Sequence, residues 1–427
     1  MSERSYPVPR QNLRRVDDHR SDADDFTFPF RGDKITELTY ACRHVLDNSE
    51  CWRYPHFMDR RETERLLEVV HQGRAAGEHL ALATVVRVNG SAYRREGTRM
   101  VVRQSGTYEC ALSGGCLEPA VASAAARVIA TGEPVIVNYD LADDSIWGLG
   151  MGCSGAVDIR IERLETDTIA SEWLRVLERG GAAVLITPLS GVSGRMIVRG
   201  ADAFVGGLSN SAIEREAIAR ADRCLHSAYP RSRTEWIGNA EIFFEVATRP
   251  PELVVFGAGD DAVPVVHLAW ALGFTVTVID VREVLLTSER FPHARLVCAH
   301  FSQFPEKVKL PSGSYVLVMN HHVERDQESL RFSLESDAAY IGALGPRSRY
   351  EKLLAGLAQQ GYVASSSKLS RVRSPVGLSL GAETPQEVAV SILGEILARQ
   401  SGFEGEFLSG SVASLHRPQD NRVLARS

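Results

Sequence analysis

A cysteine follows two glycines in the segment Leu112–Glu118, where an alanine-rich helix expected over 117–130 begins. The first backbone N–H groups of a helix have no partner within the helix and carry partial positive charge. A thiol at Cys116 would therefore be favoured as a thiolate, and the backbone of Gly114 and Gly115 would be able to bind an anion. The competing interpretation is a small buried cysteine in a tight turn.

The chain carries a second copy of this unit 96 positions later, without the glycines and the cysteine. Arg99–Arg103 aligns with Arg195–Arg199, and nine of 29 consecutive positions are identical without a gap. In the second copy, Asn210–Ala212 replaces Gly114–Cys116. A turn required only for shape would be expected in both copies. The difference favours a chemical role for Cys116, and drift after duplication is the competing explanation.

A second cysteine in the same region lies in a glycine-rich segment. Four of the eight residues of Gly148–Gly155 are glycine, and Cys153 is among them. Soft thiol ligands suit soft metals, sulfur transfer and molybdenum-type chemistry. Cys116 and Cys153 are thus candidates for catalysis and for metal binding, whereas the structural alternative for Cys153 is a flexible turn with a buried thiol.

Three arginines are concentrated in the segment Gly90–Arg99 that precedes the first copy. Guanidinium groups bind phosphate through paired N–H donors. Arg94, Arg95 and Arg99 are therefore candidate ligands for a phosphate. With Gly114, Gly115, Cys116 and Glu118 of the neighbouring motif, they are the residues of this lobe expected to bind a cofactor. A solvated surface loop is the alternative.

The second half of the chain has the pattern of a nucleotide-binding fold. A buried strand from Leu253 runs into Gly257 and Gly259, and a second strand, Thr275–Asp280, ends in a carboxylate. Strand, glycine turn, helix, strand and acid at this spacing are typical of the first βαβ unit of a Rossmann-type sheet, with the acid on a ribose hydroxyl. Asp280 would then favour NAD, and Arg282 leaves room for NADP.

Two features of this half bear on its chemistry. Asp260 and Asp261 occupy the turn that faces a pyrophosphate in such folds, and their charge would repel it. His321 and His322 follow the expected strand 315–319, at the sheet edge where ligands bind. Adjacent histidines do not have the spacing of a metal site, so they are candidate catalytic residues or ordinary exposed histidines.

Composition limits the class of protein. The 427 residues are 44% hydrophobic and 24% charged with a net charge of −6, which argues against nucleic-acid and membrane-surface binding. No apolar run reaches the length of a membrane span and no secretory segment is recognisable, so a cytoplasmic location is expected. The seven cysteines form no CxxC pair, so free thiols are expected.

The patterns predict an α/β protein in which an N-terminal α+β domain of two duplicated lobes is followed by a C-terminal Rossmann-type doubly wound parallel sheet. In chain order, the expected parts are a mobile tail over 1–33, a helical extension over 34–79, the α+β domain over 80–248 with lobes at about 80–165 and 166–248, the Rossmann-like domain over 252–400, and a mobile tail over 402–427.

The ordered motifs resemble those of the XdhC and CoxI family, accessory proteins of xanthine and carbon monoxide dehydrogenases. The motifs that carry the resemblance are Gly90–Met100, Ser113–Glu118, Gly148–Gly155, Val255–Gly259, Val278–Arg282, Arg290–Pro292, Tyr340–Gly345 and Gly377–Ile396. Departures from the family pattern include Tyr93, Met151, Ser154, Asp260 and Asn320–His322, and a divergent member is compatible with them.

The resemblance implies a chaperone that binds the molybdenum cofactor, supports its sulfuration by a cysteine desulfurase and delivers it to a molybdenum hydroxylase client. It also implies that Cys116 contacts the cofactor or its sulfur, and that the protein forms a homodimer. The alternative is an oxidoreductase of another class, dependent on NAD(P) or a metal ion, which acts on a small-molecule substrate through the Rossmann pocket and a cysteine or histidine. A scaffold that holds no ligand is the third possibility.

Overall fold

The computed structural model describes residues 60–90, 92–141, 155–164, 168–227, 230–407 and 409. The tail expected over 1–33, and most of both the expected extension 34–79 and the expected C-terminal tail, lie outside these residues. Helix α2 (Arg60–Ala75) makes up most of the described part of the extension. Within the described ranges, every helix is too short or too polar to cross a membrane.

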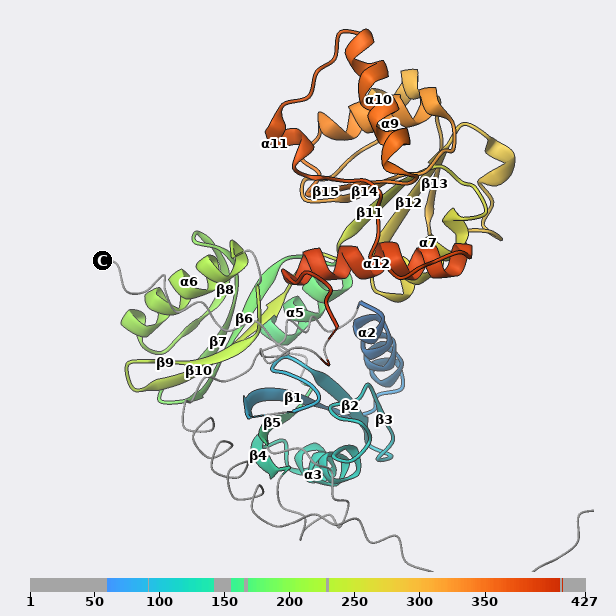
Figure 1. The fold of residues 1–427 in the computed structure, drawn as a ribbon. Helices are drawn as coiled ribbons and strands as arrows, with labels where there is room; N and C mark the ends of the chain where they lie inside the picture. The colour runs from blue at the N-terminus through green and yellow to red at the C-terminus, as the bar shows by residue number, and fades with distance from the viewer. Residues whose placement is uncertain are drawn as a thin grey trace, which may run out of the picture. The chain divides into compact units, whose positions relative to one another are not determined.

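The first lobe is an antiparallel sheet with helix α3 (Glu118–Thr131) on one face and α2 on the other (Figure 1). Successive side chains of a strand point to opposite faces of the sheet, so one strand contributes to both cores. Met100 and Val102 pack in the cluster that contains α3, and Val101 packs against α2. The strand order is β3-β2-β1-β5-β4, with bounds β1 Leu80–Asn89, β2 Arg99–Arg103, β3 Tyr108–Glu109, β4 Val135–Asp140 and β5 Ala156–Arg163.

The second lobe repeats this topology. Its strand order, β8-β7-β6-β10-β9, matches that of the first lobe strand for strand, and all its pairs are antiparallel. Helix α6 (Ser211–Leu225) covers one face and α5 (Thr168–Glu178) the other. The strands are β6 Ala183–Ser190, β7 Gly194–Gly200, β8 Ala203–Leu208, β9 Arg233–Ile237 and β10 Ala240–Ala247.

The C-terminal domain is a six-stranded parallel sheet in the order β13-β12-β11-β14-β15-β16. Chain order 3-2-1-4-5-6 is that of a Rossmann fold, with its switch point between β11 and β14. The strands are β11 Glu252–Phe256, β12 Thr275–Asp280, β13 Arg295–Cys298, β14 Tyr315–Val318, β15 Tyr340–Ala343 and β16 Val372–Arg373.

Helices cover both faces of this sheet, which explains why its central strands are continuous apolar runs (Figure 1). One face packs against α7 (Ala262–Ala271) and α12 (Pro385–Ser401). The other face carries α8 (Phe304–Lys307), α9 (Val323–Leu334), α10 (Arg347–Gln359) and α11 (Ser366–Leu369). Two 3-10 turns, Glu283–Leu285 and Phe301–Gln303, complete the connections after β12 and β13.

Substitution of Phe244 should test how far the second lobe depends on its core. Phe244 is 0% exposed on β10, so Phe244→Ala is expected to lower the free energy of unfolding of this lobe by about 3–5 kcal/mol. Phe204→Ala on β8, where the side chain is 45% exposed, is the matched control and should cost less than half as much. Denaturant titration followed by circular dichroism measures both, and equal losses would contradict this packing.

Candidate functional site

Cys116 lies at the end of the glycine loop, with its side chain only partly buried. Its thiol donates a hydrogen bond to Ser113 Oγ over 3.2 Å. Ser113 Oγ in turn donates to Glu118 Oε2 over 2.7 Å. The thiol, the hydroxyl and the buried carboxylate therefore form one hydrogen-bonded chain that fixes the position of the sulfur.

The expected unpaired N–H groups of this helix start are not what the structure shows. The N–H groups of Gly115, Cys116 and Leu117 face Ser113 Oγ at 3.3, 3.2 and 3.2 Å. One hydroxyl oxygen thus accepts from the loop up to Leu117, the N-cap residue of α3, whose own side chain provides no cap. Ser113 belongs to the motif, but its role follows from the turn geometry and had no separate sequence signal.

Glu118 is a structural residue of this turn. Its carboxylate is buried, with 1% of the residue exposed, and accepts hydrogen bonds from the N–H groups of Leu112 at 2.9 Å and Ser113 at 2.7 Å. Burial alone would raise its pKa, but the hydrogen bonds from Ser113 and Leu112 outweigh burial and lower the pKa below its usual value. These contacts account for a buried carboxylate at this place, and a contact of Glu118 with a cofactor stays a prediction.

The second lobe keeps the carboxylate and loses the thiol. Glu214 accepts a hydrogen bond from the N–H of Leu208 at 2.7 Å, as Glu118 does from Leu112. The helix start is capped there by Asn210 Oδ1, which accepts from the N–H groups of Ala212 and Ile213. The turn can therefore be built without glycines or a cysteine, so shape alone does not explain the first copy.

The two glycines of the loop differ in what they require. Gly115 has φ +108°, a conformation that side chains rarely adopt. Gly114 has no such φ, and a Cβ added to it would meet no atom within 4 Å. Neither backbone strain nor packing demands glycine at 114, which leaves close approach of a ligand as a reason for it.

Two of the three arginines expected to bind a phosphate are buried in the protein. Arg99 is buried, forms an ion pair with Glu245 of β10 and lies 5.7 Å from the ring of Trp173. Arg95 is also buried, with 2% of the residue exposed. Arg94 pairs with Glu62 of α2, and 17% of its side chain is exposed. Burial separates Arg95 and Arg99 from solvent, so Arg94 is the member of the group with access to a ligand.

The metal prediction concerns Cys116 and Cys153. Cys153 and most of its glycine segment lie outside the described residues. In the part of the chain that the structure describes, no three His, Cys, Asp or Glu side chains are grouped as a metal site would require. A metal ligand set therefore stays a prediction.

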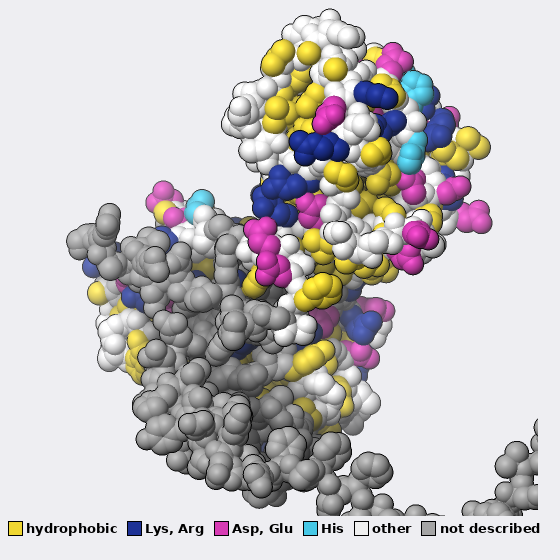
Figure 2. Space-filling model, viewed as in Figure 1, with side chains coloured by type: hydrophobic (Ala, Val, Ile, Leu, Met, Phe, Trp, Pro, Cys, Tyr) yellow, Lys and Arg dark blue, Asp and Glu magenta, His cyan; other side chains and the backbone are white. Residues whose placement is uncertain are grey.

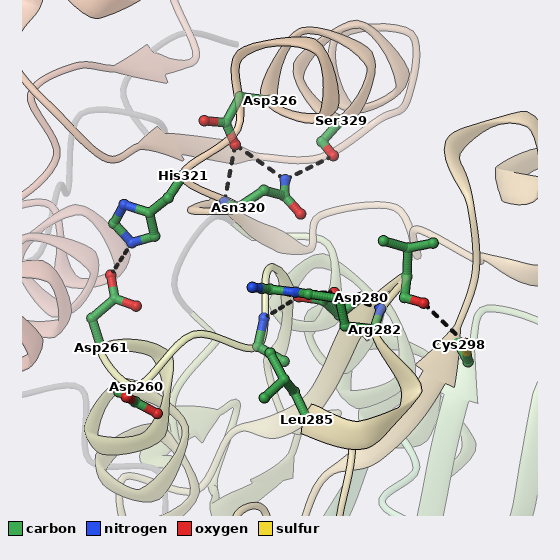
Figure 3. Close-up of polar contacts among 12 residues, drawn as sticks. Asp260, Asp261, Asp280, Arg282, Leu285, Cys298, Asn320, His321, Asp326 and Ser329 are labelled. Atoms are coloured by element: carbon green, nitrogen blue, oxygen red, sulfur yellow. Dashed lines mark hydrogen bonds and ion pairs between the residues drawn. The ribbon is translucent and has the colours of Figure 1, made fainter.

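The carboxyl edge of the parallel sheet gathers the candidates of the Rossmann domain (Figure 3). Gly257 has φ +116°, and a Cβ there would lie 2.4 Å from the carbonyl oxygen of Met319, so the turn after β11 requires glycine. A Cβ on Gly259 would lie 2.7 Å from Asp261 Oδ1.

On the face in view, Figure 2 shows basic, acidic and histidine side chains mixed over this domain rather than one continuous basic patch.

Asp280 ends β12 and is buried, with 1% of its side chain exposed. It accepts a hydrogen bond from the Ala258 N–H of the glycine turn at 2.8 Å. Arg282 supplies three more donors, its backbone N–H at 2.8 Å, Nε at 3.0 Å and Nη2 at 2.8 Å. Burial would raise the pKa of Asp280, but the hydrogen bonds from Arg282 and Ala258 lower it below its usual value.

His321 connects the turn after β14 to the turn after β11 through a side-chain contact, and these are the two strands at the switch point. Its Nε2 lies 2.6 Å from Oδ2 of Asp261, the residue that begins α7 after β11. The backbone of His321 has φ +58°, which is uncommon for a residue with a side chain. A carboxylate that orients an imidazole leaves the other ring nitrogen for proton transfer. His322 is exposed and begins α9 without capping it through its side chain.

The negative charge that Asp260 and Asp261 bring to the turn after β11 is partly neutralised. Arg290 Nη2 donates to Asp260 Oδ1 at 2.7 Å, and Arg290 Nη1 donates to the carbonyl oxygen of Ala258 at 2.9 Å. Asp261 faces His321. Arg290 belongs to one of the motifs that carry the family resemblance, but this role has no local signal, because its partner lies 30 residues away in the chain.

A second buried carboxylate at this edge was not anticipated. Asp326 Oδ1 accepts from the backbone N–H and the Nδ2 amide of Asn320, at 3.0 and 3.1 Å. Its Oδ2 accepts from Arg349 of α10, and Asn320 Nδ2 also donates to Ser329 at 3.2 Å. These contacts fix the turn that presents His321, and no local motif signals the contact between α9 and α10.

Comparison with known proteins covers both halves of the chain. Residues 73–140 match the model described as the XdhC and CoxI family, and residues 253–396 match the model described as the XdhC Rossmann domain. A solved structure from Bacillus halodurans, described as a xanthine dehydrogenase, superposes with a TM-score of 0.64 at 30% sequence identity. It covers 82% of this chain and 98% of that one.

Two curated relatives match over most of their length. A protein of Bacillus subtilis (strain 168), named as a probable subunit of xanthine dehydrogenase, is 32% identical over 329 residues, which are 75% of this chain and 93% of the relative. The molybdenum cofactor insertion chaperone PaoD of Escherichia coli (strain K12) is 24% identical over 355 residues, which are 82% of this chain and 93% of the relative.

Substitution of Glu118 should expose its structural role. Glu118→Gln replaces a buried carboxylate that accepts three hydrogen bonds, so the free energy of unfolding at pH 7 is expected to fall by about 1–3 kcal/mol. Because the folded-state pKa lies below the unfolded one, this contribution is complete above the ordinary glutamate pKa and is lost as the pH falls through the folded value. The difference from wild type should therefore shrink towards pH 3.

Denaturant titrations at several pH values measure this difference. Glu214→Gln, in the second lobe, is the matched control and should cost less, because Glu214 accepts from one N–H of the turn. A loss for Glu118→Gln that does not change with pH would contradict the assignment.

Proposed function

Because this chain belongs to the XdhC and CoxI family, we propose that it is a maturation factor that binds the molybdenum cofactor as cargo and supplies it to a molybdenum hydroxylase. One relative is named as part of a xanthine dehydrogenase, the other as a molybdenum cofactor insertion chaperone. The first name supports a client of the hydroxylase class, and the second supports the molybdenum cofactor as the cargo.

One observation carries the proposal: the first lobe has a partly exposed thiol on an open glycine loop, and the duplicated lobe has alanine at the same place. In this proposal Cys116 contacts the molybdenum or its sulfur, because a soft sulfur ligand suits that centre. Ser113 and Glu118 hold the thiol at the loop end. The second lobe then serves as the matching half of the scaffold.

The pterin phosphate is proposed to bind the backbone at Gly114, because the N–H of Gly115 already faces Ser113 Oγ. Arg94, the partly exposed arginine of its group, would exchange its contact with Glu62 for the phosphate. Sulfuration by a cysteine desulfurase would take place while the cofactor is held, before transfer to the client. The small size of the glycines lets a planar pterin approach the loop without a clash.

Removal of the thiol should separate this proposal from a structural role of Cys116. With Cys116→Ala, we expect the molybdopterin that co-purifies from cells making abundant cofactor to fall by about tenfold or more. The fluorescent oxidation product of the pterin measures it. Cys298→Ala, at an exposed thiol of the Rossmann domain, is the control and should retain wild-type amounts. Unchanged pterin and unchanged hydroxylase activation with Cys116→Ala would refute the role.

Substitution of Gly114 should separate binding from folding at the loop itself. Gly114→Ala meets no atom within 4 Å, so stability is expected to stay within about 1 kcal/mol of wild type or to rise slightly. Pterin retention should nevertheless fall, since the methyl group occupies the side from which the ligand approaches. Thermal unfolding and pterin fluorescence measure the two properties. A stable variant with full retention would show that this glycine does not face the cargo.

A further inference from the structure

We propose that Arg282 closes the Rossmann domain to nicotinamide dinucleotides by occupying the carboxylate that would bind their ribose. The strand-end acid of a dinucleotide-binding Rossmann fold accepts hydrogen bonds from ribose hydroxyl groups. Asp280 stands at that position, at the end of β12. The proposal concerns the Rossmann domain and does not depend on the role of Cys116.

Asp280 has no acceptor capacity left for a sugar. An ionised carboxylate offers about four lone-pair positions, two on each oxygen. Oδ1 accepts from the backbone N–H and Nε of Arg282, and Oδ2 accepts from the N–H of Ala258 and from Arg282 Nη2. All four positions are thus occupied by donors of the chain itself. A ribose would have to displace a guanidinium with a neutral hydroxyl, which exchanges a charge-assisted contact for a weaker one.

The carboxylate is also shielded from solvent. The side chain of Asp280 is 1% exposed, whereas that of Arg282, which donates to both carboxylate oxygens, is 42% exposed. Removing the guanidinium would leave two acceptor positions open, and the N–H contacts from Ala258 and residue 282 would still hold the carboxylate in place. Asp280 therefore stays oriented for ribose once Arg282 is gone.

The pyrophosphate side of the crevice does not fit either. The carboxylate of Asp261 lies beside Gly259 and contacts His321 across the switch point, whereas Asp260 of the same turn is paired with Arg290. A pyrophosphate needs N–H donors at this turn and is repelled by carboxylates there. The residues present therefore do not fit the dinucleotide that this fold commonly binds.

Titration of the full chain with NAD⁺, NADH and NADP⁺ by calorimetry tests the proposal. For the wild type we expect dissociation constants above about 1 mM. Arg282→Ala is expected to bind NADH at least about tenfold more tightly, because the ribose acceptor is released. The double variant Arg282→Ala with Asp280→Asn should lose that gain, since the amide is a poorer acceptor and no longer carries the charge.

Arg347→Ala is the control for loss of charge. Arg347 begins α10, its side chain is 80% exposed, and it pairs with Glu351 rather than with Asp280. It should bind as the wild type does. If circular dichroism shows that Arg282→Ala does not fold, Arg282→Lys removes the two-nitrogen fork and should give a smaller gain. A wild-type dissociation constant for any of the three dinucleotides below about 0.1 mM, or a folded Arg282 variant without a gain, overturns the proposal.

Discussion

Each turn that carries a candidate site is held in place by a buried carboxylate, which accepts hydrogen bonds from backbone N–H groups. Glu118 fixes the glycine loop of the first lobe, Asp280 joins β12 to the glycine turn after β11, and Asp326 fixes the turn that presents His321. Each carboxylate is at most 3% exposed at the residue level. Such groups are stable in the interior only when their acceptor positions are filled, so the turns cannot shift without a large cost.

The duplicated lobes show what the fold requires and what it does not. Both have the same strand order and the same carboxylate beneath the helix start, which are the parts needed for shape. The thiol and the neighbouring glycines occur in one lobe alone, where Ser113 replaces the cap that Asn210 provides in the other. Comparison within one chain therefore isolates Cys116 and Gly114 as residues that folding does not explain.

The sequence was sufficient for the fold class, because the βαβ pattern and the internal copy both depend on local periodicity. The short strands β3, β13 and β16 were not expected, since two to four residues carry little periodic signal. The site was harder to predict. The loop motif indicates Cys116 as a candidate. The burial of Arg95 and Arg99, however, follows from packing, and the pairing of Arg99 with Glu245 joins residues 146 positions apart. The saturation of Asp280 depends on side-chain rotamers that no pattern encodes.

The left-handed backbone of His321 limits which residues can replace it in related chains. Glycine, asparagine and aspartate adopt this conformation readily, whereas β-branched side chains do so at a considerable cost. Variation at this position would therefore first follow what the peptide backbone tolerates. The exchange of histidine for asparagine, which suits the backbone and cannot transfer protons, would separate the geometric requirement from a chemical one.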